Sequence, residues 1–511
     1  MNLLLALVAG ASLTLGFAPF SLWFVVPVGV GLFAYLLQLP STQKPALLGW
    51  MFGLGWFGAG ISWIHVSIAT HGGLPIILSL GLMLLLCGYL ALFPALFSFI
   101  LKRYFAIKHW PLVVAALWLF CEWLRSWLFT GFPWLSLGYS QLHGPLAGWI
   151  PIIGETGVSA LVMLIAVSAA LGIANKQFKA PLSLIVIMLL SGWVLNQHDW
   201  ATPTGKVAQV SMVQGNIKQE LRWVPEQDRP TMEKYLKITE SLWSSDIIIW
   251  PEAAIPKLEP LAQEYLMLLD AKAAEQQTGL ITGILNYNFE NQQAFNGMVV
   301  LGSKQAGSTT GSYQYNHDNR YAKHHLLPIG EFIPLEDWIR GLAPIFDLPM
   351  SSFTRGDFLQ PNLQANGYLL AAALCYEIAF PRQLTANLHD NTDFILTVSN
   401  DAWFGASHGP HQHLEIAQVR AKEFGLPVLR GTNNGVTAFV DHRGQIIQQA
   451  PQFEASSISS PIAVVRGNTP YRLFGDNIIW IIAMIGLGLA NILIRQEKSK
   501  KAQMTEADSN D

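Results

Sequence analysis

Charged residues are scarce in this chain of 511 residues. Only 13% are Asp, Glu, Lys or Arg, against about 25% in an average soluble domain, and 51% are hydrophobic. This deficit predicts segments that lie in lipid. A basic surplus is also lacking, because the net charge is -3, so we expect no nucleic-acid partner. The length leaves room for more than one domain.

Cysteine is almost absent, with Cys87, Cys121 and Cys375 as the only three. An odd, sparse set excludes a disulfide framework, and no CxxC pair indicates zinc, so we expect no metal. Cys87 and Cys121 lie in strongly apolar stretches, where a free cysteine packs as a small hydrophobic residue. Cys375 lies in a more polar half of the chain and needs another explanation.

Long apolar runs fill the first 200 residues. A membrane helix needs about 20 mostly apolar residues. Seven candidate spans precede residue 200 and an eighth lies near 476–495; the seven are about 2–17, 20–39, 46–68, 74–101, 111–128, 146–174 and 180–197. The first run lacks a basic start and another apolar run follows at once, so we interpret it as a membrane helix rather than a signal peptide.

Composition turns ordinary between the seventh and the eighth span. We therefore expect an α-helical membrane domain at 1–200, a soluble domain at 204–470, a closing span at 474–496 and a polar tail at 497–511. Lysine and arginine lie in connections that follow even-numbered spans; they are Lys44, Lys102, Arg103, Lys108, Lys176, Lys179, Arg495, Lys498, Lys500 and Lys501. Since such residues favour the cytoplasmic side, the soluble domain is predicted to face the opposite side, the periplasm in a Gram-negative bacterium.

The segment 121–141 combines tryptophans with two charges, Glu122 and Arg125. Tryptophan favours the membrane interface, and a charge near the bilayer is by default a functional hint. The alternative is a helix anchor in which the two charges simply pair. The sequence leaves both interpretations open.

The soluble domain alternates apolar, β-rich runs with helical patterns at about 226–243 and 257–276. The predicted strands are 207–214, 246–250, 279–285, 296–302, 369–377, 393–399, 426–431 and 436–441. Nearly continuous apolar strands indicate sheets that are buried on both faces. The pattern therefore predicts a layered α/β domain.

Three reactive residue types follow predicted strands or end them: Glu252, Lys323 and Cys375. Ligands and catalytic groups gather beyond the carboxyl ends of strands in α/β sheets. A thiol becomes a strong nucleophile when a cation lowers its pKa, a carboxylate can move its proton, and an ammonium can stabilise an oxyanion. Each residue also has an ordinary alternative, namely a helix N-terminal carboxylate, a solvated lysine and a buried strand cysteine.

The runs WPEAAIP, KHHLLPIGEFIP, LCYEIAF and NDAWFG resemble motifs of the nitrilase superfamily, whose members have a four-layer αββα fold and a Glu-Lys-Cys triad. GFAPF, GFPWLSLGYSQ, VQGNI and RGTNNGVTAFVD narrow the resemblance to the bacterial apolipoprotein N-acyltransferase family. The resemblance covers nearly the whole chain, including the plan of eight spans followed by an α/β nitrilase-like αββα sandwich domain.

The resemblance implies roles for individual residues. Cys375 would be the nucleophile, Glu252 the general base and acid, and Lys323 the oxyanion partner. The supporting or substrate-binding residues would be Glu331, Tyr376, Glu377 and Trp223. No cofactor is implied.

The implied reaction is a two-step exchange at the bacterial inner membrane, with the C-terminus in the cytoplasm. Cys375 would take an acyl group from a phospholipid, for which we expect phosphatidylethanolamine, and pass it to the N-terminal amine of a diacylglyceryl-modified apolipoprotein. We expect the enzyme to act as a monomer. Two alternatives stay open: a membrane-tethered nitrilase-type amidase, and a transporter or lipid-binding scaffold with an inactive domain.

Two further segments attract hypotheses. His408, His411 and His413 could hold a metal, but we favour a role in orienting the chain after NDAWFG or a place on a helix face. The apolar, proline-broken stretch 332–350 is predicted to form a lid that dips into the lipid interface, with a loop packed on the domain as its alternative.

Overall fold

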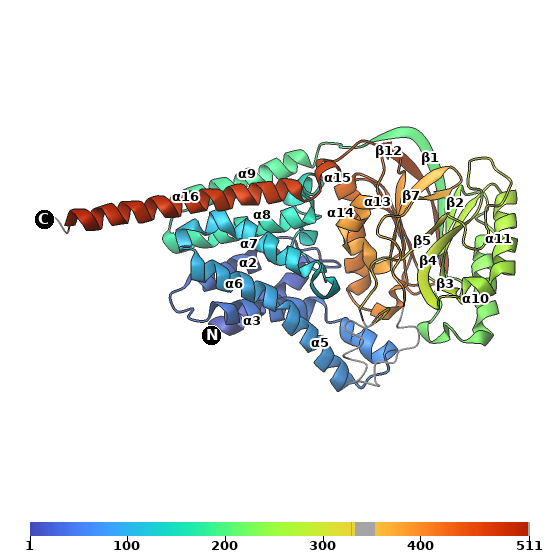
Figure 1. Cartoon of the computed structure of the whole chain (residues 1–511), viewed down its shortest axis with the longest axis horizontal. Coiled ribbons are helices and arrows are strands. Elements are labelled where there is room, and N and C mark those ends of the chain that lie inside the picture. The colour runs from blue at the N-terminus through green and yellow to red at the C-terminus, as the bar shows by residue number, and fades with distance from the viewer. Residues whose placement is uncertain (329, 333–352, 509–511) are drawn as a thin grey trace. The chain divides into compact units, whose positions relative to one another are not determined.

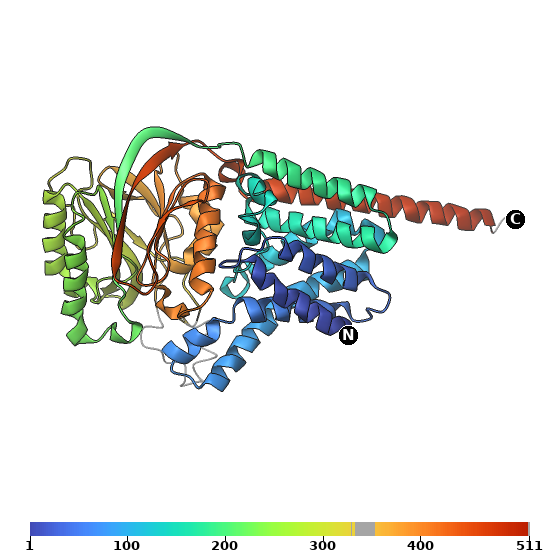
Figure 2. The same ribbon diagram turned by 180° about the vertical axis from the view of Figure 1, so that it is seen from behind.

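The computed structural model describes residues 1–328, 330–332 and 353–508. The chain divides into two compact units. The helical unit comprises Met1–Ser62, Gly81–His198 and Leu473–Asp511, and the two-sheet unit comprises Trp63–Leu80 and Asp199–Arg472. Each unit is shown from opposite sides in Figures 1 and 2.

Apolar helices make up the described part of the helical unit. They are α1 (Asn2–Ser12), α2 (Val25–Gln38), α3 (Pro45–Gly60), the main part of α5 (Ile76–Leu90), α6 (Leu92–Tyr104), α7 (Trp110–Arg125), α8 (Ile150–Asn175), α9 (Lys179–Leu195) and α16 (Asn477–Asp508). Many large apolar side chains on these helices are exposed, as in a protein that is surrounded by lipid.

Fewer of these helices are long enough to span a membrane than the sequence predicts. Within the described residues, four helical stretches meet the length and hydropathy of a span: Ile76–Tyr104, Ile107–Arg125, Pro145–Asn175 and Asn477–Lys500. A fifth forms if Pro45–Gly60 and Ile64–Thr70, which are bent by 61°, count as one span. The stretches Asn2–Gly16, Val25–Gln38 and Lys179–Leu195 are apolar but shorter. Four to five long apolar helices make this a membrane protein, and eight spans are not confirmed.

Helices α1 and α3 pack so closely that only glycine fits between them. A Cβ atom on Gly10 would lie 1.9 Å from the carbonyl oxygen of Phe52, and one on Gly55 would lie 2.0 Å from that of Leu7. Small residues allow such backbone contact between apolar helices, where side-chain hydrophobicity alone drives no association in lipid.

The pair Glu122 and Arg125 lies buried near the end of α7. Arg125 contacts Glu122 and donates through Nη1 to the carbonyl oxygens of Phe132 and Trp134, the latter at 2.7 Å. The guanidinium therefore ties the end of the helix to the turn that follows it. This geometry agrees with the paired-anchor interpretation of the sequence.

The two-sheet unit contains two six-stranded sheets. The first has the order β12-β1-β2-β3-β4-β5 and the second the order β11-β10-β9-β8-β7-β6. The strands of the first are β1 (Thr202–Gln214), β2 (Ile247–Ile249), β3 (Gly279–Asn288), β4 (Gln293–Gly302), β5 (Arg320–Ala322) and β12 (Ser456–Arg466). Those of the second are β6 (Leu363–Ala365), β7 (Tyr368–Leu374), β8 (Phe394–Ser399), β9 (Val428–Thr432), β10 (Ala438–Val440) and β11 (Ile446–Gln449).

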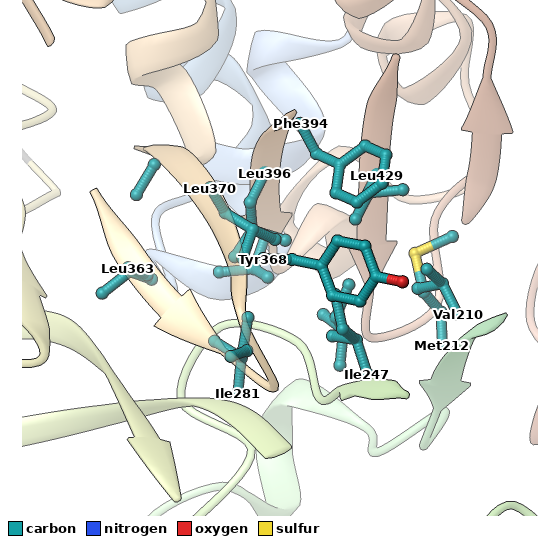
Figure 3. Packing of buried hydrophobic residues seen from close by; sticks show 14 of the residues in the cluster. Val210, Met212, Ile247, Ile281, Leu363, Tyr368, Leu370, Phe394, Leu396 and Leu429 are labelled. Atoms are coloured by element: carbon teal, nitrogen blue, oxygen red, sulfur yellow. The ribbon is translucent and has the colours of Figure 1, made fainter. Parts of the chain in front are cut away.

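The sheets face each other across an apolar core, which Figure 3 shows in close-up. Ile247 and Ile249 of β2 point into this core with Leu396 and Leu429 of the opposite sheet. Ile248, between the two isoleucines, belongs instead to a second cluster with residues of the helices. A strand that is apolar at every position is thus explained by burial on both faces.

Helices cover both outer faces of the paired sheets. In Figure 1, α10 (Pro225–Thr239) and α11 (Gln263–Glu275) lie outside the first sheet, and α13 (Pro381–Asn387) and α14 (Gly409–Phe424) lie outside the second. The order helix, sheet, sheet, helix is the four-layer arrangement that the resemblance to the nitrilase superfamily implies. A short helix, α15 (Pro470–Phe474), leads from β12 to α16.

All eight predicted strands overlap observed strands, with one informative difference. The sequence predicts one strand over 369–377, but β7 ends at Leu374 and a 3-10 turn, η10 (Cys375–Ala379), follows. Strands β5, β6, β11 and β12 were not predicted. Helix α16 continues to Asp508, so most of the predicted polar tail at 497–511 is helical.

A short segment that follows α3 belongs to the two-sheet unit and not to the helical unit. Residues Trp63–Leu80 include α4 (Ile64–Val66) and a π-helical turn, η2 (Ser67–His71). The Trp63 indole donates to Gln412 Oε1 at 3.2 Å, and Ser67 Oγ donates to the Trp403 carbonyl at 2.6 Å.

Candidate functional site

The three predicted site residues lie beyond carboxyl ends of strands in the two-sheet unit. Glu252 follows β2, Lys323 follows β5 and Cys375 follows β7. Strand β4 is antiparallel to both β3 and β5, and β2 is parallel to β3, so β2 and β5 run in the same direction. Their carboxyl ends therefore meet at one edge of the first sheet.

Cys375 has an unusual backbone conformation. Its φ is 55°, in the left-handed region that residues other than glycine seldom adopt. The strand stops at Leu374 and the chain turns sharply at Cys375, whose side chain is half-buried against the core between the sheets. Such strain at a single reactive side chain is typical of functional sites.

The Glu252 carboxylate is buried and hydrogen-bonded from two directions. Asn296 Nδ2 donates to Oε1 at 2.8 Å, and the Asn400 amide donates to Oε2 at 2.9 Å. Arg222 anchors the same loop, because its Nη2 donates to the carbonyl oxygens of Glu252 and Ala253 at 2.6 and 2.7 Å. These contacts fix the carboxylate in place.

Lys323 lies deep in the same cluster and pairs with the second glutamate, Glu331. Lys323 Nζ lies 2.8 Å from Glu331 Oε2, and both side chains are buried. Asn296 Nδ2 also donates to Glu331 Oε1 at 2.8 Å, so one amide bridges Glu252 and Glu331. The amide of Leu327 donates to Glu331 Oε2 and closes the network.

Burial dominates the protonation of this cluster. Burial and the negative charge of Glu252 raise the pKa of the Cys375 thiol to about 12, and the smaller opposing effect of Lys323 does not reverse this. Burial likewise raises the pKa of the Glu252 carboxyl, in spite of the nearby Lys323. The thiol therefore keeps its proton in the resting site and needs a base to become a nucleophile.

Lys323 stays charged in this environment. Burial by itself would lower its pKa, but the negative charges around it, first of all Glu331, raise the pKa above its ordinary value. The site therefore holds a permanent ammonium, a buried carboxyl with a raised pKa and a protonated thiol. This set can transfer a proton from sulfur to carboxylate and can stabilise a nearby oxyanion.

The remaining predicted residues have different surroundings. Glu377 is a buried acceptor of five hydrogen bonds, which come from Tyr321, His324, His325, Leu374 and Gln383. Tyr376 is buried and its ring packs edge-on against Phe380. Trp223 is 38% exposed with a φ of 67°, and the neighbouring Arg222 makes the contact with the Glu252 loop.

Several residues around the site were not assigned a role from the sequence. Asn296 lies on β4, and Ser399, Asn400 and Asp401 follow one another at the end of β8. Asn400 and Asp401 lie in the motif NDAWFG, which is the sequence signal for this part of the site. Ser399 Oγ lies 3.4 Å from Cys375 Sγ, a contact that no local pattern reveals.

The three histidines differ in position. His413 is buried on α14 and contacts Asp401, whereas His411 is partly buried and His408 precedes the helix. Among the residues that the structure describes, no group of three His, Cys, Asp or Glu side chains could hold a metal ion. The predicted lid at 332–350 lies outside the described residues, apart from Phe332.

Two family models together match most of the chain. Residues 9–168 match the Apolipoprotein N-acyltransferase N-terminal domain, and residues 209–466 match Carbon-nitrogen hydrolase. Proteins named apolipoprotein N-acyltransferase are similar over nearly the full length. The one from Photobacterium profundum is 45% identical over 503 residues, which are 98% of this chain and 96% of the relative. The one from Vibrio cholerae is 44% identical and covers 98% of both chains.

A solved structure is similar to about half of this chain. A CN-hydrolase superfamily protein from Xanthomonas campestris is 16% identical, with a TM-score of 0.36, and the match covers 50% of this chain and 91% of that chain.

Proposed function

Because the chain belongs to the apolipoprotein N-acyltransferase family, we propose that it moves a fatty acyl group from a phospholipid to the N-terminal amine of a diacylglyceryl-modified apolipoprotein. Cys375 is the nucleophile, Glu252 the general base and acid, and Lys323 the oxyanion partner. The observation that carries this proposal is the buried cluster in which a thiol, a carboxyl with a raised pKa and an ammonium act on one another.

The first step forms an acyl thioester. Glu252 takes the thiol proton while Cys375 Sγ attacks the ester carbonyl of the phospholipid. The Lys323 ammonium stabilises the oxyanion, a contribution worth about 3 kcal/mol per donor in comparable sites. Glu252 then returns its proton to the departing lysophospholipid oxygen, and the acyl group stays on sulfur.

The second step repeats the chemistry with an amine. The α-amino group of the lipoprotein cysteine attacks the thioester carbonyl, and Glu252 accepts a proton from the nitrogen. The carbon–sulfur bond breaks and the sulfur recovers its proton. Since the first product leaves before the second substrate reacts, the kinetics are ping-pong. Water must stay away from the thioester until the amine arrives.

Glu331 supports the cluster without reacting. Its carboxylate holds Lys323 Nζ at 2.8 Å and shares the Asn296 amide with Glu252, which keeps the ammonium aimed at the oxyanion. Tyr376, Glu377 and Trp223 lie near the nucleophile or the Glu252 loop. We assign the first two to shaping the acyl pocket and Trp223 to the substrate entrance.

A membrane location follows from the substrates. Exposing each CH2 of an acyl chain to water costs about 0.8 kcal/mol, so the site must work close to the bilayer. We propose eight spans, in which the three shorter apolar stretches join the four long ones and the bent pair. The basic connections favour a periplasmic two-sheet unit and a cytoplasmic C-terminus in the bacterial inner membrane. Every residue assigned to the reaction lies in one chain, so a monomer suffices.

The test uses purified protein in liposomes with a labelled acyl chain on phosphatidylethanolamine. We expect transfer of label to a diacylglyceryl-cysteine peptide, with phosphatidylethanolamine as a better donor than phosphatidylglycerol. Cys375→Ala should abolish transfer, whereas the matched control Cys121→Ala, which changes a buried cysteine of α7, should retain it. Release of free fatty acid to water with no peptide product would favour the amidase-like alternative instead.

A further inference from the structure

A second polar cluster contacts Cys375 and takes no part in the steps above. It consists of Ser399, Asp401, His413 and Arg430, all of which are buried with at most 1% of their surface exposed. Two of these residues touch Cys375, one at its sulfur and one at its backbone. Both are joined to a single carboxylate.

The sulfur contact runs through Ser399. Its Oγ lies 3.4 Å from Cys375 Sγ and 2.5 Å from Asp401 Oδ1. A hydroxyl has one proton and two lone pairs. While Ser399 donates to Asp401, it can only accept from the thiol. Asp401 therefore decides which way the hydroxyl points.

The backbone contact runs through His413. Its Nδ1 lies 3.1 Å from the same Asp401 oxygen, and its Nε2 lies 3.1 Å from the carbonyl oxygen of Cys375. The carbonyl belongs to the residue with the strained φ of 55°. A backbone in that region persists only where its surroundings hold it.

Arg430 keeps Asp401 in its charged form. Its Nη2 donates to Asp401 Oδ2 at 2.7 Å, and both side chains are buried. Although burial alone would raise the pKa of Asp401, Arg430 and His413 hold it well below its usual range. The carboxylate is thus anionic at neutral pH.

We infer that Asp401 is a positioning residue for Cys375, acting on its sulfur through Ser399 and on its carbonyl through His413. The inference rests on the proposed function, in which Cys375 is the nucleophile. Asp401 holds the sharp turn at the nucleophile and keeps the Ser399 proton away from the resting thiol. Its effect on the reaction passes through Ser399 and His413.

The same strand offers a matched control. Asp393 precedes β8 as Asp401 follows it, and it also pairs with an arginine, since Arg466 Nη2 donates to it at 2.6 Å. Like Asp401 it is buried, with 4% of its surface exposed. Asp393→Asn therefore removes a comparable charge from the opposite end of the strand.

The experiment measures alkylation of Cys375 by iodoacetamide at pH 8 and single-turnover acylation by phospholipid, in the full-length protein. The charged groups that act on the thiol are Glu252, Lys323 and Asp401. Asp401→Asn removes a negative charge and frees the Ser399 proton for sulfur, so alkylation should become about three- to tenfold faster. Acylation should become at least about tenfold slower, because the turn is no longer held.

Asp393→Asn should change both rates less than twofold at a comparable thermal stability. Equal rates for Asp401→Asn and Asp393→Asn would overturn the inference. The inference would also be overturned if the alkylation and acylation rates of Asp401→Asn fell together in proportion to the fraction of unfolded protein. If Cys375→Ala retains acyl transfer, the proposed function fails. The alkylation rate of Asp401→Asn would still test separately whether Asp401 positions Cys375.

Two further variants test the Ser399 contact and the His413 contact one at a time. They remain informative if Asp401→Asn does not fold. Ser399→Ala removes the hydroxyl that turns from Asp401 to the sulfur once the thiol has lost its proton, so the thiolate is less favoured and alkylation should slow, opposite in direction to Asp401→Asn. His413→Gln should slow acylation and leave alkylation within about twofold. An unchanged alkylation rate in Ser399→Ala would show that the Ser399 contact does not act on the Cys375 sulfur. An unchanged acylation rate in His413→Gln would show that the His413 contact does not hold the turn at Cys375.

Discussion

The helical unit and the two-sheet unit each bury an acidic and a basic side chain together, and the two clusters differ in how they are built. In the helical unit, Glu122 and Arg125 are three residues apart on α7. The Arg125 guanidinium pairs with the Glu122 carboxylate and donates hydrogen bonds to two nearby carbonyl oxygens. In the two-sheet unit, Glu252 and Lys323 come from different strand ends and meet a thiol.

The comparison distinguishes a structural ion pair, Glu122 and Arg125, here called the brace, from a reactive site. The ion pair and the hydrogen bonds of Arg125 stay within ten residues along the chain, and its guanidinium also lies 5.9 and 5.6 Å from the ring centroids of Trp56 and Phe57. The second cluster joins strand ends far apart in the sequence and includes a thiol with its proton and a carboxyl with a raised pKa. Buried charge alone therefore does not identify a functional site, whereas buried charge beside a nucleophile does.

The largest expected effect is that of Cys375→Ala. Removing the nucleophile should lower acyl transfer by about 10⁴-fold or more, since no other group in the cluster can form the thioester. Steady-state transfer to a diacylglyceryl-cysteine peptide measures this. Transfer within tenfold of the native rate would place the reaction elsewhere and would end the distinction between the two clusters.

Glu252→Gln should come second. The amide keeps the shape of the side chain and can still bond to Asn296, but it cannot accept the thiol proton. We expect acyl transfer to fall by about 10²–10⁴-fold with an unchanged KM for phospholipid. Glu122→Gln is the control from the brace, and its KM and kcat per folded molecule should stay within about twofold. An equal loss in both variants would contradict the comparison.

The pH dependence should show a smaller, graded effect. Glu252 must be ionised to accept a proton, and burial raises its pKa above the ordinary value of 4.5. Acylation should therefore rise about tenfold per pH unit on the acid side and level off above that raised pKa. Single-turnover rates across pH check this. A profile that is already flat from pH 4.5 upward, or one with the same acid limb in Glu252→Gln, would assign the proton to another group.

Arg125→Met should have the smallest effect on turnover and a clear effect on stability. It leaves Glu122 buried without its partner, which in comparable cases costs about 3–5 kcal/mol. We expect a lower midpoint of thermal unfolding in detergent, with turnover per folded molecule within about twofold. A loss of turnover at unchanged stability would show that this pair does more than brace the helix.

The sequence predicts that Glu252, Lys323 and Cys375 stand at strand ends, and the structure places them there. Glu252 follows an apolar run of three isoleucines and a tryptophan, and Cys375 ends another apolar run. Both positions can be predicted from the residues next to them in the sequence. The pKa of the thiol could not, because it depends on burial, which is a property of the assembled sheets.

The supporting residues escape prediction because their partners lie far away in the sequence. The Asn400 amide that bonds to Glu252 is 148 residues away, and His413 reaches the Cys375 carbonyl from a helix 38 residues later. Strands β5 and β6 have three residues each, which is too short for a periodic pattern. The apolar runs predict helices correctly but not their lengths, because glycines, prolines and kinks divide them.

The most direct test of the central claim is mass spectrometry of the protein after incubation with phospholipid alone. The account predicts a fatty-acyl mass on the peptide that contains Cys375, none on the peptides that contain Cys87 or Cys121, and its removal when the lipoprotein peptide is added. Slower formation of the adduct in Glu252→Gln would assign the proton transfer to that carboxyl. Acyl transfer at the full rate with no adduct on Cys375 at any time would contradict the account.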